Sequence, residues 1–356
     1  LGREEQFKLG QRMLLNYPQI FNRTPDYCLN ISATTAIRTQ ESMKSFLVGL
    51  KYNANKSTCI KPIFTAAVTD VSLRFFDLSP DYKRYETHLK SIDIKQLENL
   101  VLYHELNKDL LYRFFTKIFI NKYLKHSRNI SKNFIEDIYK YSLVIPSLSK
   151  EIKRIGFTVE DLNFRKFFTC DELAKLFLIH SAKDFLTKGP SINVLGLQIR
   201  IAVPLLVDFI KTTDAFILSE TKMIKANLRF AHSETLSPFA TLIQIEQAYN
   251  SVKNIQHYSP YTTWLPSQII PMSANIAWIL YKDIYHPLYL VKILLNEKVV
   301  HLHGLTTVVQ HSYYNWLDVR QYFIHKLDLL HVHLNHDMHN YLKIEINEEY
   351  QHEHFH

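Results

Sequence analysis

Hydrophobic spacing at the start of the chain predicts a helix, a strand and a second helix. In residues 4–17 the apolar side chains recur every three or four positions, which is the period of an amphipathic helix. A short apolar run at 27–33 is typical of a strand, and helical spacing returns at 39–50. The order helix, strand, helix indicates an α/β layer.

The middle of the chain has a different pattern. Between about residues 82 and 206, helical spacing dominates and strand-like runs are few. The segments expected to form helices are 94–107, 110–123, 134–141 and 170–186. This stretch therefore predicts a helical insertion or cap.

Strand-like runs return at 227–232 and 275–281, each near a helical segment, so the α/β layer is expected to resume after the insertion. The predicted division is an α/β core from residues 1–80 and 205–330, a helical cap at 81–204, and a tail at 331–356.

A net charge of +8 favours polyanionic ligands, because Lys and Arg attract anions over long range. The sequence has no Lys/Arg block, zinc-finger spacing or aromatic RNA-binding motif, so nucleic acid is not the expected partner. The longest apolar runs, at 199–206 and 276–281, are far shorter than the ~20 residues that a membrane-spanning helix needs. No transmembrane segment is expected.

The cysteines leave the redox compartment open. Three cysteines without CxxC spacing must leave at least one unpaired within the chain. Four sequons would allow glycosylation in the secretory pathway, at Asn22, Asn30, Asn55 and Asn129. Asn30 falls on the predicted strand, where a glycan would not fit. Residue 1 is Leu without a signal-peptide pattern after it, so the true N-terminus is expected upstream.

Histidines crowd the end of the chain, where seven of the 18 lie between residues 331 and 356. Such spacing could bind a transition metal, but nothing in the sequence fixes a coordination geometry. The expected structure is a solvated, poorly ordered tail.

The most distinctive local motif is residues 228–236, LRFAHSETL. An apolar strand ends at His232 and a helix is predicted to begin near Ser233 or Thr235, which places His232 and Glu234 at the carboxyl edge of a sheet. There they could stabilise developing charge and protonate a leaving group, as phosphate ester cleavage requires. The alternative is an ordinary helix start with an incidental histidine. A zinc deaminase is excluded, since no cysteine follows Cys170.

A second strand-to-helix junction lies at residues 31–43, with Arg38 near the turn and Thr39 as the expected helix cap. Arginine suits a bidentate grip on phosphate, and nearby hydroxyls can donate to the same oxygens. The alternative is a surface arginine beside an ordinary cap. Four further cations are weaker candidates for phosphate contacts: Lys188, Arg200, Lys222 and Lys292.

Three stretches, in order along the chain, match one known family. Residues 1–50 are similar to the region that follows its catalytic motif, and 232–238 (HSETLSP) resembles its His-Ala-Glu-Thr-Leu motif. Residues 270–276 (IPMSANI) and 294–299 (LLNEKV) are similar to its C-terminal strands. The chain thus resembles the multiple inositol polyphosphate phosphatases, which are histidine acid phosphatases, over roughly residues 1–75 and 185–300.

The resemblance implies a histidine-phosphatase-like core with a mostly parallel sheet flanked by helices, and a helical cap. It also implies hydrolysis of inositol hexakisphosphate and lower inositol polyphosphates through a phosphohistidine, without a metal or other cofactor, and 2,3-bisphosphoglycerate is a further candidate substrate. Arg38 would bind the scissile phosphate, His232 would hydrogen-bond it, and Glu234 would protonate the leaving alcohol. Ser233 replaces the family's usual alanine. A location in the secretory pathway, extracellular, at the cell surface or in the endoplasmic reticulum lumen, is implied too.

One departure from the family is large. Its Arg-His-Gly-x-Arg-x-Pro motif, which carries the nucleophile and a central strand, occurs nowhere in these 356 residues. We expect it upstream of Leu1, and expect this chain alone to be inactive, with unpaired strand edges. The alternatives are a non-catalytic pseudophosphatase that binds an anionic ligand or partner, and an unrelated basic α/β binding domain.

Overall fold

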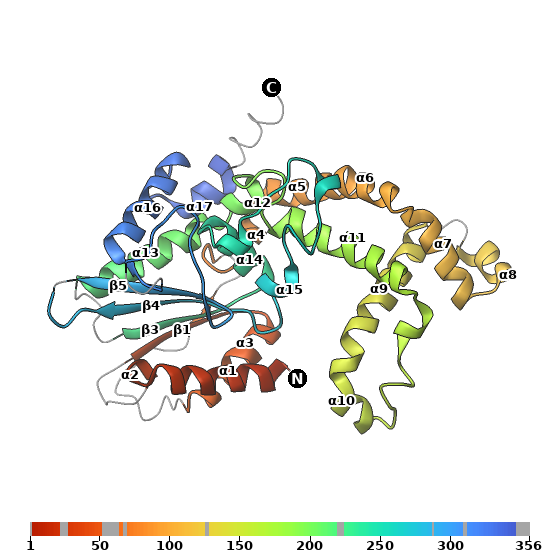
Figure 1. Ribbon diagram of the computed structural model, residues 1–356, viewed down its shortest axis with the longest axis horizontal. Coiled ribbons are helices and arrows are strands. Elements are labelled where there is room, and N and C mark those ends of the chain that lie inside the picture. The colour runs from red at the N-terminus through yellow and green to blue at the C-terminus, as the bar shows by residue number, and fades with distance from the viewer. Residues whose placement is uncertain are drawn as a thin grey trace. The chain divides into compact units, whose positions relative to one another are not determined.

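The computed structural model describes residues 2–21, 28–51, 64–66, 70–124, 128–218, 224–286, 288–308 and 312–346. These residues form two compact units (Figure 1). The first consists of His88–Asp184 and Asn254–Pro260, and the second contains the rest of the described chain.

The second unit contains every described strand. Its main helices are α1 (Gly2–Asn16), α2 (Pro18–Phe21), α3 (Ile37–Gly49), α4 (Phe75–Leu78), α12 (Leu197–Arg200), α13 (Val203–Ile217), α14 (Ser233–Leu242), α15 (Pro266–Ile269), α16 (Trp316–Leu329) and α17 (Met338–Asn340). Two longer helices, α5 (Pro80–Ser91) and α11 (Cys170–Lys188), contribute residues to both units. The predicted first helix, first strand and second helix are confirmed as α1, β1 and α3.

A parallel sheet brings the two ends of the chain together. Its strands are β1 (Cys28–Thr34), β2 (Phe64–Ala66) and β3 (Ile224–Phe230), in the order β2-β1-β3. Because β1 pairs directly with β3, the two predicted strand-to-helix junctions end at the same edge of the sheet.

A second sheet is antiparallel. It consists of β4 (Ile276–Lys282), β5 (Tyr289–Leu295), β6 (Lys298–Val299) and β7 (Tyr314–Asn315). The described strands therefore form one parallel and one antiparallel sheet, and the expectation of a single, mostly parallel sheet is not confirmed for them. Asn296 and Glu297, both with positive φ, form the two-residue turn between β5 and β6, and such a short turn can only join antiparallel strands.

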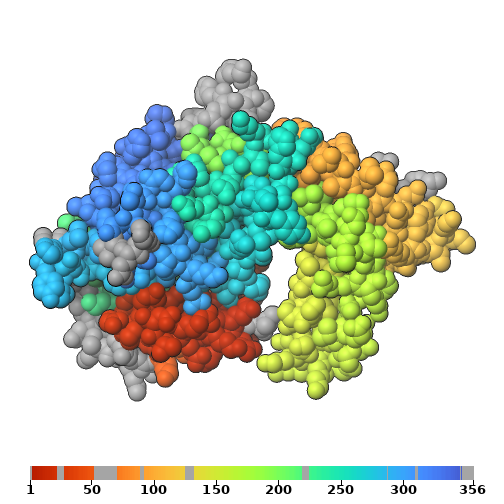
Figure 2. Space-filling model, viewed as in Figure 1, coloured from red at the N-terminus to blue at the C-terminus, as the bar shows by residue number. Residues whose placement is uncertain are grey.

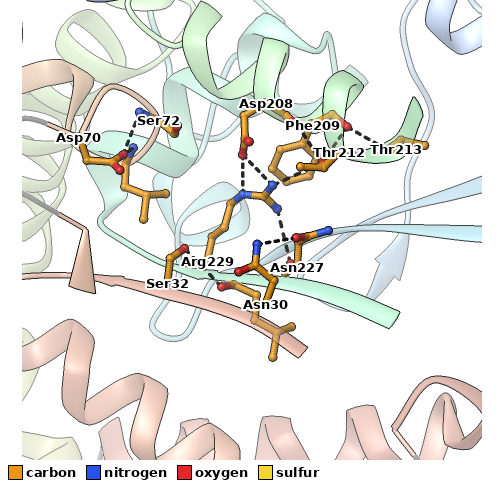
Figure 3. Close-up of polar contacts among 12 residues, drawn as sticks. Asn30, Ser32, Asp70, Ser72, Asp208, Phe209, Thr212, Thr213, Asn227 and Arg229 are labelled. Carbon is orange, nitrogen blue, oxygen red and sulfur yellow. Dashed lines mark hydrogen bonds and ion pairs between the residues drawn. The ribbon is translucent and has the colours of Figure 1, made fainter. Parts of the chain in front are cut away.

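Side chains alternate across the parallel sheet, so one face is apolar and the other polar. Leu29 and Ile31 lie in the core that includes α1 and α3. On the other face, Asn30 Nδ2 donates to Asn227 Oδ1 at 2.8 Å, and Arg229 lies nearby (Figure 3). Helices α1 and α3 therefore cover the apolar face.

Arg229 links β3 to α13 on the polar face. Its Nε donates to Asp208 Oδ2 at 2.7 Å, and its guanidinium lies 4.6 Å from the ring centroid of Phe209. The Phe209 ring in turn contacts Trp278 of β4, with centroids 5.0 Å apart. One helix therefore contacts the edge strands of both sheets.

Helices α1 and α3 cross at two glycines. A Cβ atom on Gly10 would come within 2.2 Å of the Phe46 carbonyl oxygen, and one on Gly49 within 2.0 Å of the Phe7 carbonyl oxygen. Only glycine allows the backbones to approach this closely. Residues of α1, shown in red, form a strip of the surface in Figure 2.

The described residues of the first unit form helices and connecting segments, and none of them belongs to a strand. It contains α6 (Asp93–Leu100), α7 (Tyr103–Phe114), α8 (Lys117–Phe119), α9 (Arg128–Val144) and α10 (Ser149–Arg154). The helix expected at 94–107 is split into α6 and α7, because Leu102 adopts a left-handed conformation with φ 54°. No glycine or proline in the sequence marks this break.

The structure describes residues 331–346 of the histidine-rich tail. Tyr341, Leu342 and Ile346 are buried, so residues up to 346 are not the solvated tail that the sequence suggested. His352, His354 and His356 lie outside the described residues. Among the described residues, no group of three or more His, Cys, Asp or Glu side chains could hold a metal ion.

The sequons and cysteines differ in their settings. The Nδ2 atom of Asn30, which a glycan would need, is bonded to Asn227. Asn129 lies in α9, whereas Asn22 and Asn55 lie outside the described residues. Cys28 is disulfide-bonded and Cys170 is free. Among the described helices, none is both long and apolar enough to cross a membrane.

Candidate active site

The two strand-to-helix junctions place the predicted site residues together. Ala33 pairs with Phe230 near the carboxyl ends of β1 and β3. Arg38 lies in the first turn of α3, His232 is the residue that precedes α14, and Glu234 lies in the first turn of α14.

Arg38 and His232 are directly bonded, with 3.0 Å between Nη2 and Nδ1. A guanidinium can only donate, so Nδ1 must be the unprotonated ring nitrogen. The proton of the neutral imidazole is then on Nε2, which donates to Thr34 Oγ1 at 2.9 Å. The neighbours of His232 thus select one tautomer.

Hydroxyl groups continue this chain of hydrogen bonds. Thr34 Oγ1 lies 2.7 Å from Thr39 Oγ1, which donates to the Ala36 carbonyl oxygen at 2.8 Å. The sequence analysis predicted Thr39 as the cap of α3, and this prediction is wrong. Ala36 occupies the cap position, and the Thr39 hydroxyl belongs to the histidine network. Thr34 and Thr39 are buried, so the hydroxyl end of the network is shielded from water.

The surroundings of His232 favour the neutral ring. Burial lowers its pKa, and the nearby charges of Arg38 and Arg74 lower it further. The ring of Phe76 packs edge-on against the imidazole, with centroids 5.8 Å apart.

Glu234 has a cationic partner. Lys188 Nζ lies 3.2 Å from Oε1, and Ser233 Oγ donates to Oε2 at 2.9 Å. Burial raises the pKa of Glu234, but the Lys188 charge and hydrogen bonds outweigh it, and the pKa is lowered. The carboxylate is therefore ionised in this structure. The Ser233 hydroxyl, where the family motif has alanine, contributes one of these bonds.

Arg38, His232 and Glu234 line one cavity of about 360 Å³. Its other lining residues are Ala36, Arg74, Phe76, Asp77, Tyr82, Lys83 and Glu86. None of these seven residues was predicted from the sequence. For Arg74, Phe76 and Asp77 the available signal was the Arg74-Phe-Phe-Asp77 run, in which two opposite charges flank two aromatic residues.

Four further cations were proposed from the sequence, and one of them, Lys188, contacts Glu234. Arg200 Nε donates to the Leu195 carbonyl oxygen at 2.5 Å, and Lys292 Nζ lies 4.3 Å from the ring centroid of Tyr313. Lys222 lies outside the described residues.

Comparison with solved structures identifies the fold. The multiple inositol polyphosphate phosphatase of Bifidobacterium longum, in complex with inositol hexasulfate, aligns with TM-score 0.68 and 18% identity, over 88% of this chain and 77% of that one. The chain has a histidine acid phosphatase-like fold. This fold also aligns with the phytase from D. castellii, with TM-score 0.62 and 13% identity over 91% of this chain and 63% of that one. The phytase from Citrobacter braakii aligns with TM-score 0.54 and 10% identity, over 97% and 87%.

Sequence comparison adds nothing to this likeness. No protein-family model matches the chain, and no curated protein matches it. At these identities the likeness concerns the fold, so the chemistry must be argued from the residues of the cavity.

Proposed function

We propose that this chain carries the phosphate-binding and proton-donating part of a phosphomonoesterase site for inositol polyphosphates, including inositol hexakisphosphate. The observation that carries the proposal is the convergence of Arg38, His232 and Glu234 on one cavity at the carboxyl edge of β1 and β3. The family motifs in the sequence and the shared fold support the same substrate class.

In this proposal Arg38 is the main phosphate ligand. A phosphate oxygen would take over the N–H that Arg38 gives to His232 Nδ1. The arriving negative charge raises the pKa of His232, so that Nδ1 can gain a proton from solvent and donate it to a second phosphate oxygen. The Thr34 bond to Nε2 holds the ring in place throughout.

Glu234 would donate the proton to the leaving alcohol. A general acid must be protonated before it acts, whereas the Lys188 ion pair keeps Glu234 ionised without substrate. A bound phosphate dianion opposes this effect, because its charge attracts Lys188 and raises the pKa of the carboxyl group. Substrate binding itself would thus favour the reactive protonation state.

The nucleophile must come from elsewhere in this proposal, since the Arg-His-Gly-x-Arg-x-Pro motif does not occur in the printed sequence. β3 is an edge strand of the described parallel sheet, and no residue of it is buried. We propose that a further strand, carrying the nucleophilic histidine, pairs along this edge and attacks phosphorus. The complete enzyme would need no metal.

A pseudophosphatase that binds an anionic ligand is the second candidate, and the missing motif is the observation that favours it. For either, we propose a location in the secretory pathway. The disulfide at Cys28 supports this, because disulfides persist mainly in oxidising compartments.

The test is to express the longest open reading frame containing this chain and to measure phosphate release from inositol hexakisphosphate. The phosphatase proposal predicts release that falls about 10²–10⁴-fold in Glu234→Ala. Tight binding of inositol hexakisphosphate without release, weakened by Arg38→Gln, would establish the pseudophosphatase. If there is no phosphate release and no binding that depends on Arg38, both proposals are refuted.

A further inference from the structure

Arg74 is a cation at the cavity to which the proposed roles give no task. It lines the same wall as Phe76 and Asp77, and its side chain is only 21% exposed. We propose that Arg74 binds a second phosphate group, adjacent to the one held by Arg38, and thereby selects bisphosphates and polyphosphates over monophosphates. This inference rests on the proposed function.

Arg74 sits on a fixed segment of backbone. The carboxylate of Asp70 accepts from the backbone N–H groups of Ser72 and Leu73, at 2.9 and 2.7 Å, and so closes a tight turn (Figure 3). The Leu73 carbonyl oxygen then accepts from Thr235 Oγ1 of α14 at 2.9 Å. This bond ties the residue before Arg74 to the helix that carries Glu234.

The residue after Arg74 is an anchor. Phe75 is completely buried, so α4 cannot shift without exposing an aromatic side chain. Arg74 is thus held from both sides of the chain. A phosphate ligand on such a segment needs little rearrangement to bind, which favours affinity.

Asp77 and Phe76 orient the guanidinium of Arg74. Nε donates to Asp77 Oδ2 at 2.6 Å, and Nη2 pairs with the same oxygen. Within the described part of the chain, the remaining N–H groups have no protein acceptor and are available to an anion. The Arg74 Cζ lies 5.5 Å from the Phe76 ring centroid, and that ring also contacts His232. The ring therefore separates Arg74 from the imidazole while keeping both at one cavity.

The charges at the cavity suit more than one phosphate. Arg38 and Arg74 line the same cavity as His232, and both of their charges lower its pKa. Lys83 adds a third cation on the cavity wall. Three carboxylates line it too: Asp77 is paired with Arg74, Glu234 is paired with Lys188, and Glu86 lies on the same helix as Lys83. A cavity of about 360 Å³ falls within the usual range for small-molecule sites, about 300–1,000 Å³, and a lone orthophosphate would leave it largely unfilled.

The experiment compares ligands by calorimetry on the purified chain: orthophosphate, glycerol phosphate, 2,3-bisphosphoglycerate and inositol hexakisphosphate. In Arg74→Gln the affinity for the last two falls about tenfold, and that for the first two less than about threefold, as expected for loss of a charge-assisted hydrogen bond to the second phosphate. Arg74→Lys keeps the charge without the planar guanidinium, so its affinities for the last two ligands lie between those of Arg74→Gln and the wild type.

The matched control is Arg84→Gln. Arg84 is a 75% exposed arginine paired with Asp81 in α5, outside the cavity lining, and its loss leaves all four affinities unchanged. If Arg74→Gln does not melt cooperatively, Arg74→Lys decides the question alone.

Two results overturn this inference while sparing the proposed function. They are equal losses for all four ligands, or no loss for any, in Arg74 variants of a chain whose phosphate binding still depends on Arg38. If Arg38→Gln also changes none of the affinities, the proposed function itself fails.

Discussion

The two sides of the cavity hold their titratable groups in different charge states. Around His232, a cation donates to a buried ring that stays neutral, and hydroxyl groups hold the proton on Nε2. Around Glu234, a cation neutralises a carboxylate that stays ionised. On each side a neighbouring cation, Arg38 or Lys188, disfavours the protonated form. An anion that binds between them would favour protonation of both groups.

The first way to break this comparison is to remove the hydroxyl beneath His232. Thr34→Val preserves the shape but leaves the buried Nε2–H without an acceptor, so we expect the free energy of unfolding to fall by about 1–3 kcal/mol. Urea denaturation measures it. Thr87→Val is the control, because the exposed Thr87 hydroxyl bonds only its own helix, at the Lys83 carbonyl oxygen. Equal losses in the two variants would contradict a special role for Thr34.

A second test separates the two sides by pH. His232 has a pKa below its ordinary value of 6.5, so the unfolded chain binds its proton first and stability is lost as pH falls below about 6.5. Glu234 has a pKa below its ordinary 4.5, so its contribution is lost only below about pH 4.5. In His232→Asn the loss of stability below about pH 6.5 should be smaller than in the wild type, and the remainder is expected from His180, because burial lowers its pKa too. The loss below about pH 4.5 should persist, and denaturation curves across pH 3–8 measure both.

Removing the cation beside Glu234 tests the other side. In Lys188→Met we expect the pKa of Glu234 to rise, because burial then acts with little opposition, while the pKa of His232 changes less. NMR titration of both side chains measures this. Lys44→Met is the control, since Lys44 pairs with Glu41 on an exposed surface. An unchanged pKa of Glu234 would show that the ion pair does not form in solution.

The smallest effect is expected at Ser233. Ser233→Ala removes the hydrogen bond to Glu234 Oε2 and should lower stability by about 0.5–1.5 kcal/mol at pH 7. The pKa of Glu234 should rise, in the same direction as in Lys188→Met. A fall in this pKa would mean that the hydroxyl does not donate to the carboxylate.

Sequence patterns predicted the site residues that lie at strand-to-helix junctions, because the signals for such junctions are local in sequence. The apolar run before His232 and the acidic first turn after it located the start of α14, and the same logic located Arg38. Pairing between distant residues was not predictable. Lys188 was one of four candidate cations, and nothing in its own segment indicates that it reaches Glu234, 46 positions away.

The fold was predicted to a similar depth. Spacing identified α1, β1, α3, β3 and β4. The antiparallel pairing of the second sheet was missed, because the Asn296–Glu297 turn lacks the usual glycine. The break at Leu102 was missed for the same reason, since leucine rarely adopts positive φ. The division into a core and a cap at residues 81–204 stays a prediction.

The pairing of Asn30 with Asn227 has a consequence for synthesis. The two residues are 197 positions apart. At chain growth of about 5–20 residues per second, the Asn30 amide waits roughly 10–40 s before its partner has even been made. In a secretory compartment, sugar transfer to Asn30 would compete with strand pairing during this interval. A glycan attached first would block the β1–β3 pairing that brings Arg38 and His232 together.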